Sequence, residues 1–133
     1  MARSFAFLES FAHALLRIAA GFTFSLHGYQ KTFGLFGGMG HGRPAPVHSL
    51  MWVAGVIESI GGPLIFLGLF TRPVAFLLCG EMAVAYFRQH APHGLWPIAN
   101  GGELAVLYCF IYLYLSQAGA GPLSLDRLVR GKK

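Results

Sequence analysis

Long apolar runs, separated by short stretches rich in glycine and proline, set the pattern of this sequence. A membrane-spanning helix needs about 20 mostly apolar residues, and runs close to that length predict helices over residues 8–31, 48–70, 73–90 and 100–117. These runs carry almost none of the Lys, Glu and Gln that form the polar face of a helix in a soluble bundle. The pattern therefore predicts an all-α fold, an integral membrane four-helix bundle that forms one domain over residues 1–133.

Composition supports the bilayer as the solvent of this chain, since 55% of the residues are hydrophobic and only 11% are charged. The net charge of +5 does not indicate a nucleic-acid partner, because the basic residues form no continuous stripe. Lys and Arg near the ends of the predicted helices favour one side, which predicts both termini in the cytoplasm. Six lie on that side (Arg3, Arg72, Arg127, Arg130, Lys132, Lys133) and three on the other (Lys31, Arg43, Arg88). The tail at 126–133 is expected to face anionic lipid headgroups.

Each predicted helix carries an ionisable residue within or beside its apolar run. Arg17, Glu58, Glu81 and Glu103 come from the first to the fourth helix in turn. Such a residue near the middle of a bilayer costs about 2.5 to 3.5 kcal/mol, so it usually faces the interior and finds a partner. Depth along the helices predicts that Arg17 lies near Glu58 and Glu81, and that Lys31 pairs with Glu103 close to the outer interface.

One face of the first helix carries Arg17, Gly21, Phe24, Gly28 and Lys31, which allows a neighbouring helix to approach closely at the small residues. Two interpretations of the buried charges stay open. They are structural ion pairs that fix helix packing, or they form a ligand or proton site, because three carboxylates exceed what one arginine needs for neutrality.

The outer end of the predicted bundle gathers His90, Trp96 and Asn100, together with His27 from the first helix. These side chains could stack on and hydrogen-bond the head of a quinone, while Trp96 equally fits the aromatic belt of a membrane boundary. The histidine spacing matches no established zinc or copper pattern, so no metal site is predicted.

Two cysteines, Cys79 and Cys109, fall at similar depths on the third and fourth predicted helices. Both are turned by more than about 100 degrees from the glutamate on their own helix. They are therefore interpreted as packing residues rather than a redox pair, and whether they ever pair stays open. The sequence also lacks a dithiol motif, a haem-attachment motif and a nucleotide fingerprint.

Several separated stretches resemble one family. They are LHGYQK at 26–31, ESIGG at 58–62, GLFTR at 68–72, NGGE at 100–103 and PLSLD at 122–126, together with Arg17. In this order they are similar to the DoxX family of small bacterial membrane proteins, over almost the whole chain. The resemblance implies a multi-pass protein of the bacterial inner (plasma) membrane, linked to quinol oxidase, thiosulfate:quinone or thiol-redox systems. It brings no established catalytic residue.

The resemblance and the residues together lead to the hypothesis of a membrane subunit of a respiratory or thiol-redox system with a quinone site and no covalently bound cofactor. In this hypothesis His27 and Lys31 hydrogen-bond a quinone oxygen, Glu103 carries a proton, and a soluble or membrane oxidoreductase partner transfers the electrons. Two alternatives remain. One is a small-molecule or proton transport component that forms homo-oligomers, and the other is a structural scaffold that holds a soluble enzyme at the membrane.

Overall fold

The computed structural model describes residues 2–131, with side chains from Phe5 onward, and every regular element in this part of the chain is helical. The prediction of an all-α fold is confirmed. The side chain of Arg3 and the residues Lys132 and Lys133, which entered the charge count above, lie outside the described residues. In chain order the elements are α1 (Ala2–Phe33), α2 (Leu50–Leu67), α3 (Thr71–Ala85), η1 (Tyr86–His90), η2 (Ala91–His93), α4 (Pro97–Asn100), α5 (Glu103–Ala118) and α6 (Leu125–Val129).

Local chemistry explains where the long helices begin and end. The side chain of Ser49 accepts the backbone N–H of Trp52 and starts α2, two residues later than the sequence predicts. Gly68 ends α2 in the left-handed conformation, with φ 68°, which a residue without a side chain adopts most easily. The helix α3 runs directly into the π-helical turn η1, so residues 71–90 are helical without a break. The tail, predicted only as a basic segment, contains the short helix α6.

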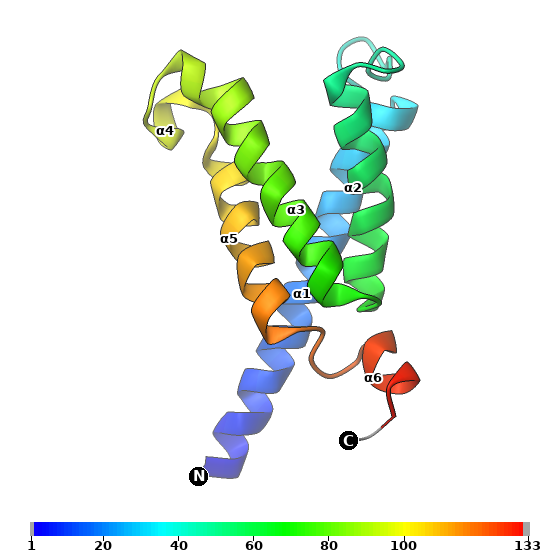
Figure 1. Cartoon of the computed structure of the whole chain (residues 1–133), viewed down its shortest axis with the longest axis vertical. Helices are drawn as coiled ribbons and strands as arrows, with labels where there is room; N and C mark the ends of the chain where they lie inside the picture. Colours follow the sequence, from blue (N-terminus) through cyan, green and yellow to red (C-terminus); the bar gives the residue numbers. More distant parts are fainter. Residues whose placement is uncertain (1, 132–133) are drawn as a thin grey trace.

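The long helices are arranged as two pairs, α1 with α2 and α3 with α5 (Figure 1). The pairs meet near the lower end of the view, where residues 68–70 join α2 to α3, and they diverge toward the upper end. This divergence separates the upper halves of α2 and α3.

The two helices α1 and α2 approach each other along glycines that repeat every seven residues, Gly21 and Gly28 on α1 and Gly55 and Gly62 on α2. A Cβ atom built on Gly21 would lie 2.7 Å from the Cα of Phe66, far inside normal contact distance. The predicted close approach of a neighbouring helix at the small residues of α1 is confirmed, and the neighbour is α2.

The core is built around Phe24 of α1, which is almost fully buried. Its ring contacts Tyr108 and Tyr112 of α5 edge-on, with centroid distances of 4.9 and 5.0 Å. Ile65 of α2 and Leu78 of α3 are part of the same buried cluster, which therefore joins both helix pairs.

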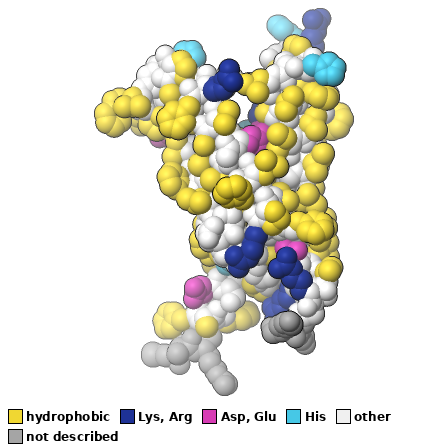
Figure 2. All heavy atoms as spheres, in the orientation of Figure 1, with side chains coloured by type: hydrophobic (Ala, Val, Ile, Leu, Met, Phe, Trp, Pro, Cys, Tyr) yellow, Lys and Arg dark blue, Asp and Glu magenta, His cyan; other side chains and the backbone are white. Residues whose placement is uncertain are grey.

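The outer surface is apolar on all four long helices. Large side chains that are more than half exposed include Phe22 on α1, Ile60 on α2, Phe76 on α3 and Phe110 on α5. Figure 2 shows hydrophobic side chains spread over the middle of the molecule, while the visible Lys and Arg lie near the top and in the lower third. Two helices, Phe5–Phe33 and Leu50–Leu67, are long and apolar enough to cross a membrane by length and composition.

Candidate functional site: a cleft between α2 and α3

The divergence of the helix pairs leaves a cleft of about 820 Å³ between α2 and α3. The end of α1, the turn η1 and Met39 of the loop after α1 complete its lining, so residues from four elements and one loop meet there. Figure 2 shows a carboxylate within the hollow between the two pairs. A volume of this size lies within the usual range of small-molecule sites, which is about 300 to 1,000 Å³.

An ion pair lies at the floor of the cleft. The Nζ atom of Lys31 donates a hydrogen bond to Oε1 of Glu58 over 2.6 Å. Glu58 is 1% exposed, and its second oxygen, Oε2, has no hydrogen-bond partner within the described residues. The ammonium group has three N–H donors, so the pair has hydrogen-bonding capacity for a ligand.

Glu81 supplies a second carboxyl group to the cleft. Both of its oxygens are buried, and neither has a hydrogen-bond partner in the part of the chain that the structure describes. Glu81 lies close enough to Glu58 and Lys31 for their charges to interact. Buried polar groups in folded proteins are almost always paired, so two carboxylates with three unpartnered oxygens beside one ammonium group indicate a place for a proton or a ligand.

The walls of the cleft are mainly apolar and adaptable. Three of the four methionines of the chain, Met39, Met51 and Met82, line it. Methionine is flexible and polarisable, and it is common at surfaces that adapt to apolar ligands. Gly80 also lines the cleft, and a Cβ atom built on it would meet nothing within 4 Å. This glycine therefore leaves room for a ligand and is not needed for helix packing.

The mouth of the cleft is formed partly by η1, which contributes Gln89 and His90. A π-helical turn widens the helix by one residue and is frequent at functional sites. His90 also lies 3.1 Å through Nδ1 from the carbonyl oxygen of Asn100, which fixes the ring at the edge of the cleft.

The predicted partner of Lys31 was wrong. Lys31 pairs with Glu58, whereas Glu103 is exposed at the first position of α5 and does not line the cleft. The long lysine side chain extends inward from the end of α1. The predicted pairing compared only the depths of the backbone positions and did not include the length of this side chain. His27 is also outside the lining, because its ring packs edge-on against Tyr108 at a centroid distance of 6.2 Å.

Two of the three outer-face candidates have other surroundings. Trp96 is 72% exposed and does not line the cleft. Asn100 organises the connection between η2 and α5, since its Oδ1 accepts the N–H of Gly102 and its Nδ2 donates to the carbonyl of Gly94. Only His90 of this group lines the cleft.

The prediction that Arg17 lies with Glu58 and Glu81 was also wrong. Its guanidinium group is fully buried and donates to four backbone carbonyls at 2.6 to 2.8 Å. These carbonyls belong to the last turn of α2 and to the segment after α5, namely Ile65, Phe66, Ala120 and Leu123. Carbonyls at the end of a helix have no intrahelical partner, so Arg17 is a structural clamp.

Asp126 is a structural partner of this clamp that the sequence did not reveal. Its carboxylate accepts the backbone N–H groups of Phe70 and Thr71, both over 2.9 Å, at the start of α3. Burial raises the pKa of Asp126, but these N–H groups and the nearby Arg130 outweigh it and hold that pKa below its ordinary value. The available signal was that Asp126 is the single acidic residue of the basic tail.

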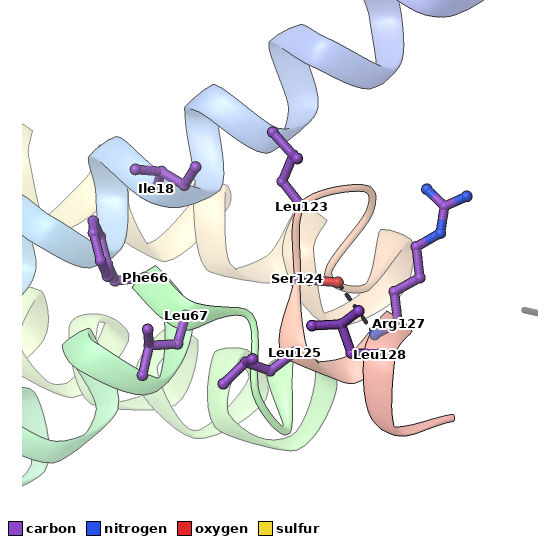
Figure 3. Close-up of a pocket in the computed structure, with 8 residues that line it drawn as sticks. All are labelled: Ile18, Phe66, Leu67, Leu123, Ser124, Leu125, Arg127 and Leu128. Carbon is purple, nitrogen blue, oxygen red and sulfur yellow. Dashed lines mark hydrogen bonds between the residues drawn. The ribbon is translucent and has the colours of Figure 1, made fainter. Parts of the chain in front are cut away.

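A second hollow, of about 540 Å³, lies beside α6 (Figure 3). Six of its eight lining side chains are apolar, among them Ile18, Phe66 and Leu128. The Arg127 guanidinium extends away from these walls in the close-up. The hollow contains no carboxylate or buried cation among its lining residues, so the α2–α3 cleft is the better candidate for chemistry.

The fold and the cleft define a small all-helical membrane protein with an ionisable site between two helix pairs. The sequence model of the DoxX family matches residues 12–91. An uncharacterized protein of Haemophilus influenzae is 48% identical over 116 residues, which are 85% of this chain and 87% of that relative. The "Putative oxidoreductase CatD" of Bacillus subtilis is 32% identical over 123 residues, 90% of this chain and 88% of the relative. The chain belongs to the DoxX family. No solved structure matches it.

Proposed function

We propose that this protein is a multi-pass subunit of a membrane oxidoreductase system and that the α2–α3 cleft binds the ring of a quinone as a mobile substrate. The observation that carries the proposal is the combination of apolar walls with Lys31, Glu58 and Glu81 at the floor, where the Glu81 oxygens have no partner within the described residues. The name of the Bacillus subtilis relative adds support for an oxidoreductase system.

In the proposed arrangement α1, α2, α5 and the continuous helix formed by α3 and η1 all cross the bacterial plasma membrane, with both termini in the cytoplasm. Residues 71–90 would extend about 30 Å, which is close to the thickness of the hydrocarbon core. The 16 residues of α5 reach about 24 Å, and α4 with its flanking loop lies at the outer interface. Exposed apolar side chains on all four helices support this arrangement.

The entrance to the cleft favours a ligand that arrives from the lipid. Six wall residues are also among the large hydrophobic side chains exposed on the surface, namely Met39, Leu50, Val53, Phe76, Leu77 and Val84. In a bilayer these side chains would contact acyl chains. A lipid-soluble molecule could therefore enter sideways, with its ring against the polar floor and its tail between α2 and α3.

The polar floor suits the two oxygens of a quinone. Quinones carry two electrons and two protons between membrane enzymes. Lys31 would donate a hydrogen bond to a ring carbonyl oxygen while it keeps its contact with Glu58. Glu81 would exchange a proton with a ring hydroxyl of the reduced form, since its oxygens have no donor among the described residues. A soluble or membrane oxidoreductase partner would exchange the electrons.

Binding of decylubiquinone to the protein in nanodiscs tests this proposal. We expect saturable binding that stabilises the fold, by about 2.7 kcal/mol at a concentration 100 times the dissociation constant. Gly80→Phe should abolish binding because it adds a large side chain to the cleft wall at a position where a Cβ atom meets nothing within 4 Å, and Glu81→Gln should weaken binding at least tenfold. Gly80→Ala and Glu103→Gln are the matched controls, and both should bind as the wild type does. No saturable binding to the wild type, or normal binding to Gly80→Phe, would overturn the proposal.

The transport alternative is less well supported by the shape of the cleft. Inward from Glu58, α2 and α3 come into contact, since a Cβ atom on Gly61 would lie 2.8 Å from the side chain of Leu78. Further inward, the buried Ile65, Leu115 and Arg17 fill the space between the helices. A cleft that ends at a packed core favours a binding site over a pathway between the two faces.

A further inference from the structure

The two cysteines of the chain lie in contact across the α3–α5 interface. The Sγ atoms of Cys79 and Cys109 are 3.7 Å apart, and both residues are free cysteines. From the sequence, both cysteines are interpreted as packing residues and whether they ever pair is left open, and the structure places their Sγ atoms in contact. The angle between each cysteine and the glutamate on the same helix does not show how α3 and α5 are rotated about their axes relative to each other.

The distance is short enough for a disulfide. A disulfide bond needs its sulfurs about 2.05 Å apart. Closing the gap requires a shift of roughly 1.6 Å shared by two side chains. The helices already pack along each other here, with Leu78 of α3 and Tyr108 of α5 in the same buried cluster.

The position of the pair restricts the oxidant. Cys79 lies eight residues after the start of α3, which is about 12 Å along the helix. Cys109 lies nine residues before the end of α5, about 13 to 14 Å from the same end of the molecule. Both depths are close to half of the hydrocarbon core of about 30 Å. A charged aqueous thiol reagent does not reach this depth, whereas a lipid-soluble oxidant does. Both side chains are also partly exposed on the apolar surface.

We propose that Cys79 and Cys109 are a redox-active dithiol that a membrane quinone oxidises to a disulfide joining α3 to α5. Both S–H bonds break and one S–S bond forms, so the thiols lose two electrons and two protons. The quinone accepts both electrons and both protons on its two ring oxygens and becomes the quinol. The oxidant is the quinone of the proposed function, so the inference rests on the proposed function for its oxidant.

The disulfide would act on the wall of the cleft. Gly80 and Glu81 follow Cys79 directly in α3, and both line the cleft. A covalent link at Cys79 would hold this part of α3 against α5. It would therefore restrict movement of α3 toward α2, the movement that would narrow the cleft.

The experiment uses the reduced full-length protein in nanodiscs under anaerobic conditions, with decylubiquinone as the oxidant. The ring of this quinone is fully substituted, so it does not add to thiols. We expect the intact monomer to lose two hydrogen atoms in mass and to lose both N-ethylmaleimide adducts. An equal amount of quinol should form, and dithiothreitol should restore both adducts.

Three variants separate a specific dithiol from general thiol oxidation. Cys79→Ser and Cys109→Ser keep one thiol each, and neither should form an intramolecular disulfide or quinol. The double variant Cys109→Ala, Phe110→Cys keeps two thiols but moves one to the exposed position of Phe110, which is turned by about 100 degrees. This matched control should retain both adducts. A lipid-permeable chemical oxidant, 4,4′-dithiodipyridine, tests the geometry without a quinone.

The outcomes distinguish this inference from the proposed cleft. Failure of 4,4′-dithiodipyridine to join the cysteines within one monomer overturns the dithiol. A disulfide with that reagent but none with decylubiquinone overturns the role of the quinone. Saturable quinone binding with both thiols intact overturns the inference alone. If decylubiquinone oxidises the thiols in Gly80→Phe as well as in the wild type, the dithiol is supported. In that case the quinone reaches the cysteines from the lipid, and the result does not depend on binding in the cleft.

Discussion

The close approach of α1 and α2 predicts opposite effects for the same substitution at two glycines. A Cβ atom at Gly21 would lie 2.7 Å from the Cα of Phe66 and 2.8 Å from the carbonyl oxygen of Gly62, and both are backbone atoms that cannot rotate away. A Cβ atom at Gly80 would meet nothing within 4 Å. Gly21→Ala should therefore destabilise the fold, and Gly80→Ala should stabilise it.

The magnitudes follow from two competing effects. Alanine in place of glycine inside a helix gains about 0.5 to 1 kcal/mol from backbone entropy and helix propensity. At Gly21 the helices must also part by at least roughly 0.8 Å to bring the Cα of Phe66 to normal carbon contact, because the backbone nitrogen of Phe66 would lie closer still. Overpacking of this kind costs about 1 to 3 kcal/mol. We expect a net loss of about 1 kcal/mol for Gly21→Ala and a gain of up to about 1 kcal/mol for Gly80→Ala.

Unfolding in mixed micelles measures this difference. Circular dichroism followed while the fraction of dodecyl sulfate rises gives the free energy of unfolding for each variant. A separation of about 2 kcal/mol corresponds to roughly a 30-fold difference in the unfolding equilibrium constant. Gly28→Ala should behave like Gly21→Ala, because its Cβ atom would meet the backbone of Ser59. If Gly21→Ala were as stable as Gly80→Ala, the glycine-lined contact between α1 and α2 would be refuted.

Three further predictions concern the polar groups. Arg17→Met should destabilise the fold by about 3 to 5 kcal/mol in the same assay, since it removes the guanidinium donor from four carbonyls, although Ile65 still accepts the N–H of Gly68, and Arg17→Lys should not fully restore the stability. Lys31→Met should cost more stability than the double variant Lys31→Met, Glu58→Gln, because the second change removes an uncompensated charge; equal losses would contradict the pair. The lowered pKa of Asp126 gives stability that is present above its unfolded pKa of about 3.9 and is lost as the pH falls through the lower folded value. Asp126→Asn should lose about 0.5 to 2 kcal/mol at neutral pH, and the difference from the wild type should shrink below about pH 4.

The helices were predictable because their signals are local. Apolar runs, the prolines at 73 and 92, and the glycines after Lys31 each act within a few residues of their own position. The small-residue face of α1 was predictable for a similar reason, because helix periodicity places Gly21 and Gly28 on one side. That face did not reveal its neighbour, which became apparent only from the glycines of α2.

The partners of the buried charges were not predictable from depth alone. Depth ignores the length and direction of side chains and the rotation of each helix about its axis. Lys31 begins near the outer end of α1, but its side chain reaches Glu58 near the middle of α2. Arg17 lies at a depth similar to that of Glu81, yet it points toward backbone carbonyls at the end of α2. Rotation similarly brings Cys79 and Cys109 together.

The two polar clusters differ in how completely their hydrogen-bonding groups are paired. At the clamp, Arg17 donates to four carbonyls and Asp126 accepts two backbone N–H groups, and the hydroxyl of Thr71 is the only buried side-chain polar atom there without a partner within the described residues. At the cleft, three carboxylate oxygens of Glu58 and Glu81 have no partner within the described chain. A cluster that only fixed helix packing would gain stability from pairing these oxygens or from apolar residues in their place. This difference is why we assign a structural role to the first cluster and propose ligand binding at the second.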